Sequence, residues 1–384
     1  MSEKKDTQLW GISMDVPVII VDREHQVLYL DRPSGDPNEA KYENVFILPL
    51  DTTSELIEPV STWHGQKCVV MDLSRSSGRK ELMAFIAHES FHCVQDQLGI
   101  EASNPSLPHL STIQGRTLMQ VELMELLKAM EQENLELKTN HIKNALCLRT
   151  IRYRNFKDAR PVEGKTEMNE GLAQYTGLTR AGYSGEALLN EYRIAIRNFQ
   201  HIQNEAGYPY YSGSLYAFLN DQSGKHWKKH LPKTYLHEIT ASVYGIDAEK
   251  TAEHVVDELL LKDEYKDISS LFMANSVEEL TALFSTNILK LPLKEIQVQF
   301  RSNLVVSIPD KGTVYNNIVV TGDWGRLNVT REGRVLISKD AIVLNADSMK
   351  AGDKHVKGEN WILEMNDDWE ISVNEDGQYL EKHN

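Results

Sequence analysis

The chain has 384 residues, of which 41% are hydrophobic and 25% are charged, as in ordinary globular proteins that contain more than one packed unit. Its net charge of −15 at pH 7 argues against nucleic acid and anionic membranes as partners, because both would repel an acidic chain. The three cysteines, Cys68, Cys93 and Cys147, are too few for a disulfide framework. The polar first ten residues and the lack of an apolar run of about 20 residues complete the prediction of a cytoplasmic protein.

The first 75 residues have the pattern of a small β-sheet. Turn-rich stretches, such as residues 32–37, separate short runs that are rich in β-branched and aromatic residues. The strands predicted from these runs cover residues 18–21, 26–30, 45–48 and 67–71.

Beyond about residue 77 the apolar residues recur with the spacing of helices. Met119, Leu123, Leu126, Leu127 and Met130, for example, lie on one helical face. The helices predicted in this way cover about residues 81–99, 112–137, 139–156, 186–199, 214–220, 248–261 and 277–289.

The pattern changes back to strands near residue 291, with glycine-containing turn signals between them. The strands predicted here cover residues 296–300, 304–308, 318–321, 335–338, 361–365 and 369–373. We therefore predict an α+β protein. It has a β-rich region over residues 1–75 that packs on the next domain, a mainly helical domain over 76–290, and a C-terminal antiparallel β module, sandwich or barrel-like, over 291–384.

One predicted helix carries a metal-binding pattern between a start signal at residues 76–78 and a stop signal at Gly99. His88 and His92 are four residues apart and project from the same helical face, while Glu89 lies about 100° around the helix. Two imidazoles on one face can share a zinc ion, and the adjacent carboxylate reaches the metal's water without becoming a ligand. This HExxH pattern predicts two zinc ligands and a general base. The alternative is two ordinary histidines on a half-buried helix.

A candidate third ligand lies in the segment Asn169-Glu170-Gly171-Leu172-Ala173. This segment resembles the one that supplies the zinc-binding glutamate from a second helix in gluzincin peptidases related to aminopeptidase N. The resemblance implies that Glu170 completes a His₂Glu set, which leaves a fourth position open as in catalytic zinc sites. It implies one Zn²⁺ per chain and a zinc metallopeptidase. Glu163 and Glu167 lie outside the matching motif and are less favoured ligands; for Glu170 itself, the alternative is a solvent-exposed carboxylate.

The spacing between the two motifs differs from that of the aminopeptidase N family. Here 77 residues, Cys93 to Asn169, separate the second histidine from the glutamate segment, a much longer gap than the family has. Two predicted helices fill it, and a helical hairpin can leave the ligand site and return to it. The closest resemblance is therefore to uncharacterised gluzincin-like proteins. Glycine within a helix costs about 1 kcal/mol, so Gly171 predicts a close approach to the helix that carries His88.

A tyrosine-rich segment, residues 207–215, resembles the YxxG segment in which gluzincins carry a tyrosine that stabilises the transition state. The matching residue is Tyr210, with Tyr208 and Tyr211 as alternatives. A phenol donor near the metal would stabilise the oxyanion of a tetrahedral intermediate. The other interpretation is a tyrosine that packs loop against helix.

The sequence thus predicts a metallopeptidase in which Glu89 moves the proton of a zinc-activated water to the leaving amine of a peptide or protein substrate. The alternatives are a zinc-binding protein without catalysis and a hydrolase of a non-peptide amide or ester. Asp96 and Asn169 are candidates for orienting the two histidines. The oligomeric state is left open.

Two other groups of residues are noted. The arginines near the end of the second long predicted helix could hold a substrate carboxylate, although a solvated or ion-paired helical face is favoured. The remaining histidines considered lack a metal motif and are assigned to surface or packing positions. These residues are Arg149, Arg152, Arg154 and Arg160, and His226, His230, His237 and His254.

Overall fold

The computed structural model confirms the predicted α+β class, because helices take up 46% and strands 24% of it. It divides into two compact units. The first comprises Met1–His109, Val121–Ala195 and Ala206–Leu260, and the second comprises Leu110–Gln120, Ile196–Glu205 and Leu261–Asn384. The residues that the structure describes are 9–50, 59–75, 78–199, 207–274, 276–300, 305–308, 310–330, 332–352, 354–374 and 377–382.

The N-terminal strands form the predicted small sheet, with six strands in the order β3-β4-β2-β1-β6-β5. The central strands β1 and β6 pair in parallel and the others antiparallel. Alternate residues, such as Ile19 and Val21 of β1, are buried in its core, as expected for a sheet with one packed face. The strands are β1 (Val18–Asp22), β2 (Val27–Leu30), β3 (Ala40–Tyr42), β4 (Val45–Pro49), β5 (Val60–Trp63) and β6 (Gln66–Asp72).

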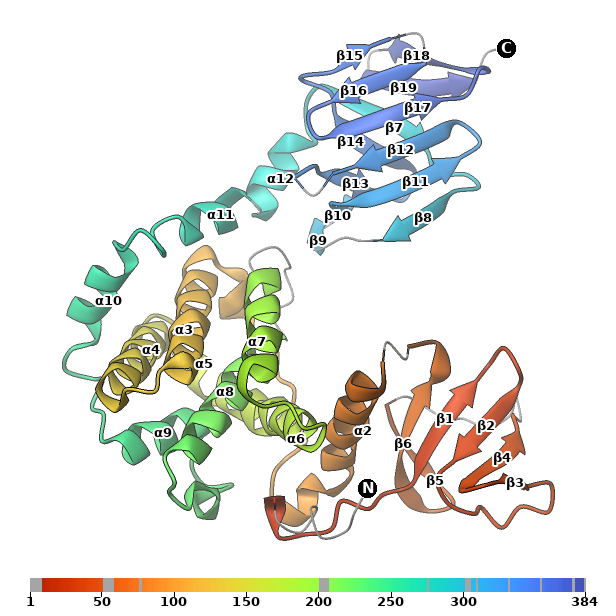
Figure 1. Ribbon diagram of the computed structural model, residues 1–384. Helices are drawn as coiled ribbons and strands as arrows, with labels where there is room; N and C mark the ends of the chain where they lie inside the picture. Colours follow the sequence, from red (N-terminus) through yellow and green to blue (C-terminus); the bar gives the residue numbers. More distant parts are fainter. Residues whose placement is uncertain are drawn as a thin grey trace. The chain divides into compact units, whose positions relative to one another are not determined.

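Helices occupy the middle of the chain, as predicted, and Figure 1 shows α2 between the strand β6 and the helix α6. None of the helices formed by the described residues has the length and apolar character needed to cross a membrane. The helices are α2 (Arg79–Val94), α3 (Ile113–Glu131), α4 (Leu135–Asn155), α5 (Ala159–Thr166), α6 (Leu172–Arg180), α7 (Gly185–Phe199), α8 (Tyr208–Gln222), α9 (Leu236–Tyr244), α10 (Ala252–Leu260), α11 (Ile268–Ala274) and α12 (Val277–Leu283).

One predicted helix is too long. The sequence pattern extended it from residue 277 to 289, but α12 ends at Leu283 and Asn287 has a φ of 46°, which interrupts a right-handed helix. The following residues form β7 (Ile288–Pro292) instead, and β7 pairs with β14 (Ala341–Asn345). Leu289 and Leu291 are buried in the sheet core and their neighbours in β7 are not. The apolar residues there therefore follow the two-residue period of a strand rather than the period of a helix.

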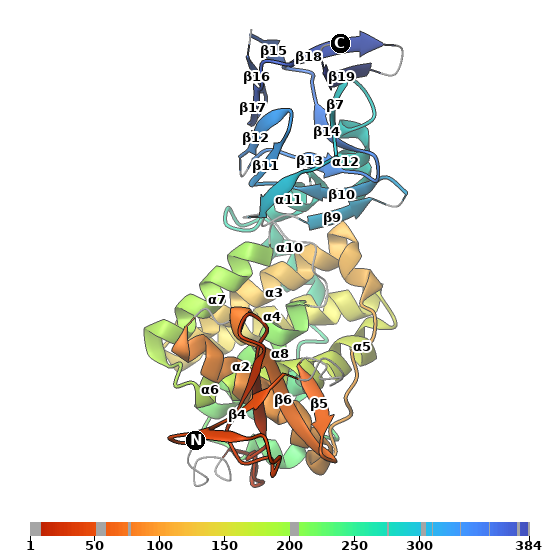
Figure 2. The same cartoon turned by 90° about the vertical axis from the view of Figure 1, so that its right-hand side faces the viewer.

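The C-terminal strands form two sheets that face each other (Figure 2). The sheets have the orders β18-β19-β7-β14-β13-β10-β9 and β15-β16-β17-β12-β11-β8. Apolar residues from both, including Leu344 and Leu363, share one core. The pairs are antiparallel except for β19 with β7. The remaining strands are β8 (Gln297–Phe300), β9 (Val305–Ile308), β10 (Gly312–Tyr315), β11 (Ile318–Gly322), β12 (Gly325–Val329), β13 (Val335–Ile337), β15 (Lys350–Ala351), β16 (His355–Gly358), β17 (Trp361–Met365), β18 (Trp369–Asn374) and β19 (Gly377–Lys382).

Candidate metal centre

The helix α2 presents the HExxH residues from its C-terminal half. The predicted stop signal is confirmed, because a 3₁₀ turn at Gln95–Leu98 follows α2 and Gly99 ends it with a left-handed φ of 72°. The predicted start signal includes Ser76 and Ser77, which lie outside the described residues. His88 and Glu89 are buried and His92 is half-buried, so the histidines line an interior site rather than a solvated helical face.

Glu170 reaches the same site from a second helical segment. It lies in a single π-helical turn, Glu167–Gly171, between α5 and α6. Such turns insert one residue into a helix and are found frequently at functional sites. Nε2 of His88 and Nε2 of His92 lie 3.2 Å apart, and each lies 3.3 Å from Oε2 of Glu170. The structure therefore brings together the three residues that the two motifs predicted.

The separations of these three atoms fit a zinc ion. Tetrahedral ligands at about 2.0–2.1 Å from zinc lie roughly 3.3 Å from one another. In addition, Oε2 of Glu170 is buried and makes no hydrogen bond to any described residue, although it faces two ring nitrogens. A cation at their centre would satisfy all three atoms, and a set of two histidines and one glutamate is typical of catalytic zinc.

Glu89 lies beside the three ligand atoms without joining them. Its Oε1 is 4.0 Å from Nε2 of His88, and its Oε2 has no hydrogen-bond partner among the described residues. Burial raises the pKa of Glu89 above the usual range of a glutamate. A buried carboxylate with a free oxygen atom next to a metal position has the arrangement of a general base.

Three neutral amides surround the ligands and fix their orientation. Nδ1 of His92 lies 2.8 Å from Oε1 of Gln95, whose Nε2 donates to Oδ1 of Asn169 at 2.8 Å. Asn169 then donates to both Asn104 and Oε1 of Glu170, and Asn104 also donates to that oxygen, at 2.6 Å. Because Gln95 uses its Nε2 to donate to Asn169, its Oε1 must accept a hydrogen from Nδ1 of His92. The lone pair of His92 is then on Nε2. Oε1 of Glu170 is similarly occupied, so Oε2 is the oxygen left for a metal.

The predicted role of Asp96 is wrong. Asp96 is exposed and pairs with Lys67 at 3.1 Å, because its position after the end of α2 turns it away from the histidines. Asn169 acts through Gln95 rather than directly on a histidine. Gln95 and Asn104 were not predicted. The spacing of three between His92 and Gln95, which places both on one helical face, is the signal that was available for Gln95.

Replacing Gln95 with alanine is expected to weaken zinc binding about 10- to 100-fold, because residues that orient metal ligands contribute on that scale. The affinity can be measured by competition with a chromogenic chelator. Asp96→Ala is the matched control, since it changes the neighbouring residue at the surface, and it should leave the affinity unchanged. Equal zinc affinities for Gln95→Ala and wild type would show that the amide chain does not orient His92.

Tyr210 lies over the imidazole of His88, with ring centroids 5.7 Å apart and planes within 8° of parallel. It belongs to the first turn of α8. Burial, together with the nearby Glu170 carboxylate, raises the pKa of Tyr210, so the phenol keeps its proton and stays a donor. Of the two alternatives, Tyr208 is buried in the core and Tyr211 packs against Tyr192. Among the three tyrosines, the one that matches the motif is thus the one in contact with a predicted ligand.

Two glycines allow the ligand-bearing segments to approach one another, and one of them differs from the prediction. A Cβ on Gly171 would lie 2.7 Å from Cα of Gly213, so Gly171 permits contact with α8 rather than with the His88 helix. The approach to α2 occurs further along, at Gly177, where a Cβ would lie 2.6 Å from the carbonyl oxygen of Ala84. The predicted neighbour of Gly171 was wrong because the spacing of residues within one helix does not reveal which other helix packs against it.

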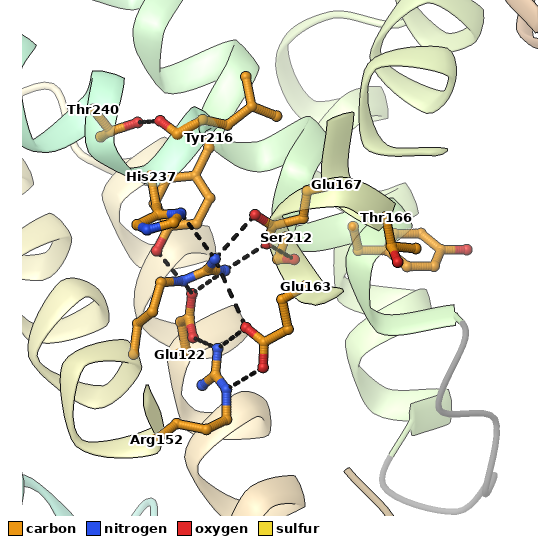
Figure 3. Close-up of polar contacts among 12 residues, drawn as sticks. Glu122, Arg152, Glu163, Thr166, Glu167, Ser212, Tyr216, His237 and Thr240 are labelled. Carbon is orange, nitrogen blue, oxygen red and sulfur yellow. Dashed lines mark hydrogen bonds and ion pairs between the residues drawn. The ribbon is translucent and has the colours of Figure 1, made fainter. Parts of the chain in front are cut away.

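The other candidate residues lie elsewhere. Arg149 and Arg152 are almost completely buried and bind glutamates of α3, α5 and the π-helical turn (Figure 3). Neither arginine contacts the three ligand atoms. Glu163 and Glu167, the less favoured ligand candidates, form ion pairs with these arginines and are not part of the group of three. The exposed arginines pair at the surface, Arg154 with Glu249 and Arg160 with Glu238. Of the four histidines that were assigned to surface or packing positions, His237 is buried and His226, His230 and His254 are exposed.

Comparison of the chain with protein-family models, with curated proteins and with solved structures gave no match. The chemistry of the group formed by His88, His92 and Glu170 is therefore the basis for a function of this protein.

Proposed function

We propose that this protein is a zinc-dependent metallopeptidase of the gluzincin type. The observation that carries the proposal is the convergence of Nε2 of His88, Nε2 of His92 and Oε2 of Glu170 at mutual separations of 3.2–3.3 Å. When bound, zinc would polarise the substrate carbonyl and lower the pKa of a water molecule toward about 7.

The residues around the ligands supply the remaining chemistry in this proposal. Glu89 accepts a proton from the attacking water and returns it to the nitrogen of the departing amine, a role for which its unpartnered Oε2 is suited. Tyr210 donates a hydrogen bond from its phenol hydroxyl to the developing oxyanion from its position over His88.

Three features together support the resemblance to gluzincins. The two histidines share one helix, the glutamate comes from the π-helical turn that leads into α6, the helix packed closely on α2, and the tyrosine comes from a third helix. The helices α3 and α4 account for the long stretch of sequence between the histidines and Glu170. Peptides or proteins are the proposed substrates.

A peptide library analysed by mass spectrometry tests the proposed activity. We expect cleavage products that disappear when zinc is removed with 1,10-phenanthroline and return when zinc is added back. Small ester and amide substrates are included in parallel. Hydrolysis of these alone would replace the peptidase by a different metal-dependent hydrolase. A zinc-loaded protein that cleaves no substrate of either class would favour a non-catalytic zinc protein.

A further inference from the structure

A pocket of about 420 Å³ lies between α4, α5, α9 and the segment that leads into α10. Its size falls in the range of small-molecule sites in proteins. Part of its wall is apolar, with Leu146, Ala241 and Ile246. None of the three predicted zinc ligands lines it, so it is separate from the metal centre.

Arg149 lines the pocket, and its position determines which atoms of His237 and Tyr153 can donate hydrogen bonds. It is 1% exposed and binds Glu122 and Glu167. Figure 3 shows these two glutamates and His237. Nη1 of Arg149 also lies 3.3 Å from Nδ1 of His237 and donates to the hydroxyl oxygen of Tyr153 at 2.9 Å. The same Nη1 donates to Oε2 of Glu167 at 2.9 Å. A guanidinium has donors and no acceptor, so a hydrogen on Nδ1 of His237 would point at a cation, and it is the lone pair of Nδ1 that faces Arg149.

Two hydrogen-bond donors are consequently left at the pocket wall. His237, which is only 7% exposed, must carry its hydrogen on Nε2, and Tyr153 keeps its hydroxyl hydrogen. Within the described part of the chain neither hydrogen has an acceptor, and both side chains line the pocket. His237 is buried and Tyr153 is half-buried, and a ligand that brings an acceptor into the pocket can pair with both donors.

The surrounding charges favour an uncharged acceptor. At the rim, Arg154 and Arg160 are already paired with Glu249 and Glu238. Behind the wall, two arginines face three glutamates, a cluster in which acidic groups are in excess. A carboxylate placed beside this cluster would be repelled, whereas a carbonyl oxygen can accept both hydrogen bonds without adding charge.

We propose that this pocket is a second binding site, which takes a small uncharged molecule whose carbonyl oxygen accepts from His237 and Tyr153 and whose apolar part lies against Ile246. This site does not depend on the proposed peptidase function, because none of the three predicted zinc ligands lines it.

Benzamide is a suitable probe, with benzoate as its charged analogue and toluene as an analogue without an acceptor. In methyl-detected NMR titrations of the full chain, benzamide should shift the Ile246 signal with a dissociation constant on the order of 1 mM. Toluene should bind about three- to tenfold more weakly because it lacks the acceptor, and benzoate at least as weakly. The dissociation constant should be the same for zinc-loaded and chelator-treated protein.

Two tyrosine variants make the test specific. Tyr153→Phe removes one donor and should weaken benzamide binding about three- to tenfold, while Tyr379→Phe in the C-terminal module should not change it. An unshifted Ile246 signal, tighter binding of benzoate, equal binding of toluene, or a requirement for zinc would each overturn the proposal. These four comparisons use the wild-type chain, so the test stands even if Tyr153→Phe does not fold.

Discussion

Replacing Glu89 with glutamine is expected to lower kcat/KM for a cleaved peptide by about 10²–10⁴-fold, the usual contribution of a general base. Glutamine has nearly the same volume as glutamate but cannot accept the proton of the attacking water. Because Glu89 is not one of the three predicted ligands, the variant should bind zinc with the same affinity as the wild type. Kinetics and metal analysis on the same preparation measure both effects.

The matched control is Glu81→Gln, which changes an exposed glutamate in the first turn of the same helix. It should keep both the zinc and the activity. Full activity in the Glu89 variant would remove this residue from the mechanism, and loss of zinc together with activity would assign it to the ligand set instead.

Replacing Glu163 with glutamine should destabilise the protein by about 1.5–3 kcal/mol at pH 7, the cost of losing hydrogen bonds between charged groups, because Arg152 keeps its other partner, Glu122, at 2.7 Å. Glu163 is completely buried, its Oε1 lies 2.6 Å from Nε of Arg152, and the same oxygen lies 2.6 Å from Nε2 of His109. Denaturant unfolding monitored by circular dichroism gives the free energy of unfolding for both proteins.

The same substitution should alter how stability depends on pH. Burial alone would raise the pKa of Glu163, but the Arg152 guanidinium outweighs it and holds this pKa well below the usual range. A pKa that is lower in the folded state contributes stability above the unfolded value of about 4.3, and this stability is lost as the pH falls below it. The difference between wild type and Glu163→Gln should therefore shrink from pH 7 to pH 3.

Glu253→Gln is the control for this experiment, because Glu253 pairs with Arg154 of the same helix α4 but is exposed. It should change stability little at either pH. A Glu163 variant that is as stable as wild type at pH 7, or a difference that does not vary with pH, would contradict the account of the buried cluster.

The grouping of His88, His92 and Glu170 could be predicted largely from the sequence because its determinants are local. A spacing of four residues puts His88 and His92 on one helical face, and a short motif identified Glu170 and another identified Tyr210. The π-helical turn that carries Glu170 was not predictable, because one inserted residue hardly disturbs the apolar pattern of the flanking helices. Asn104 was missed for a different reason, since it comes from a loop that meets the site only in the folded chain.

The burial of the ion-paired arginines could not be predicted from the polarity of their side chains. Arg149 and Arg152 were interpreted as a surface or ion-paired face, and they are ion-paired but inside the protein. Their partners Glu122, Glu163 and Glu167 come from other segments, so no spacing within one helix indicates burial.

In the C-terminal module, some strands could not be predicted because they are short. Its short strands, such as β10 and β16, give too few residues for an alternating pattern to be recognised.

The most direct test of the central claim is the zinc content of the purified protein, measured by mass spectrometry for wild type, His92→Ala and Glu170→Ala. His226→Ala, which removes an exposed histidine, is the control. We expect close to one zinc per chain in wild type and control, and its loss in both ligand variants. Wild-type protein that takes up no zinc, or ligand variants that retain it fully, would contradict the assignment of His88, His92 and Glu170 as a zinc site.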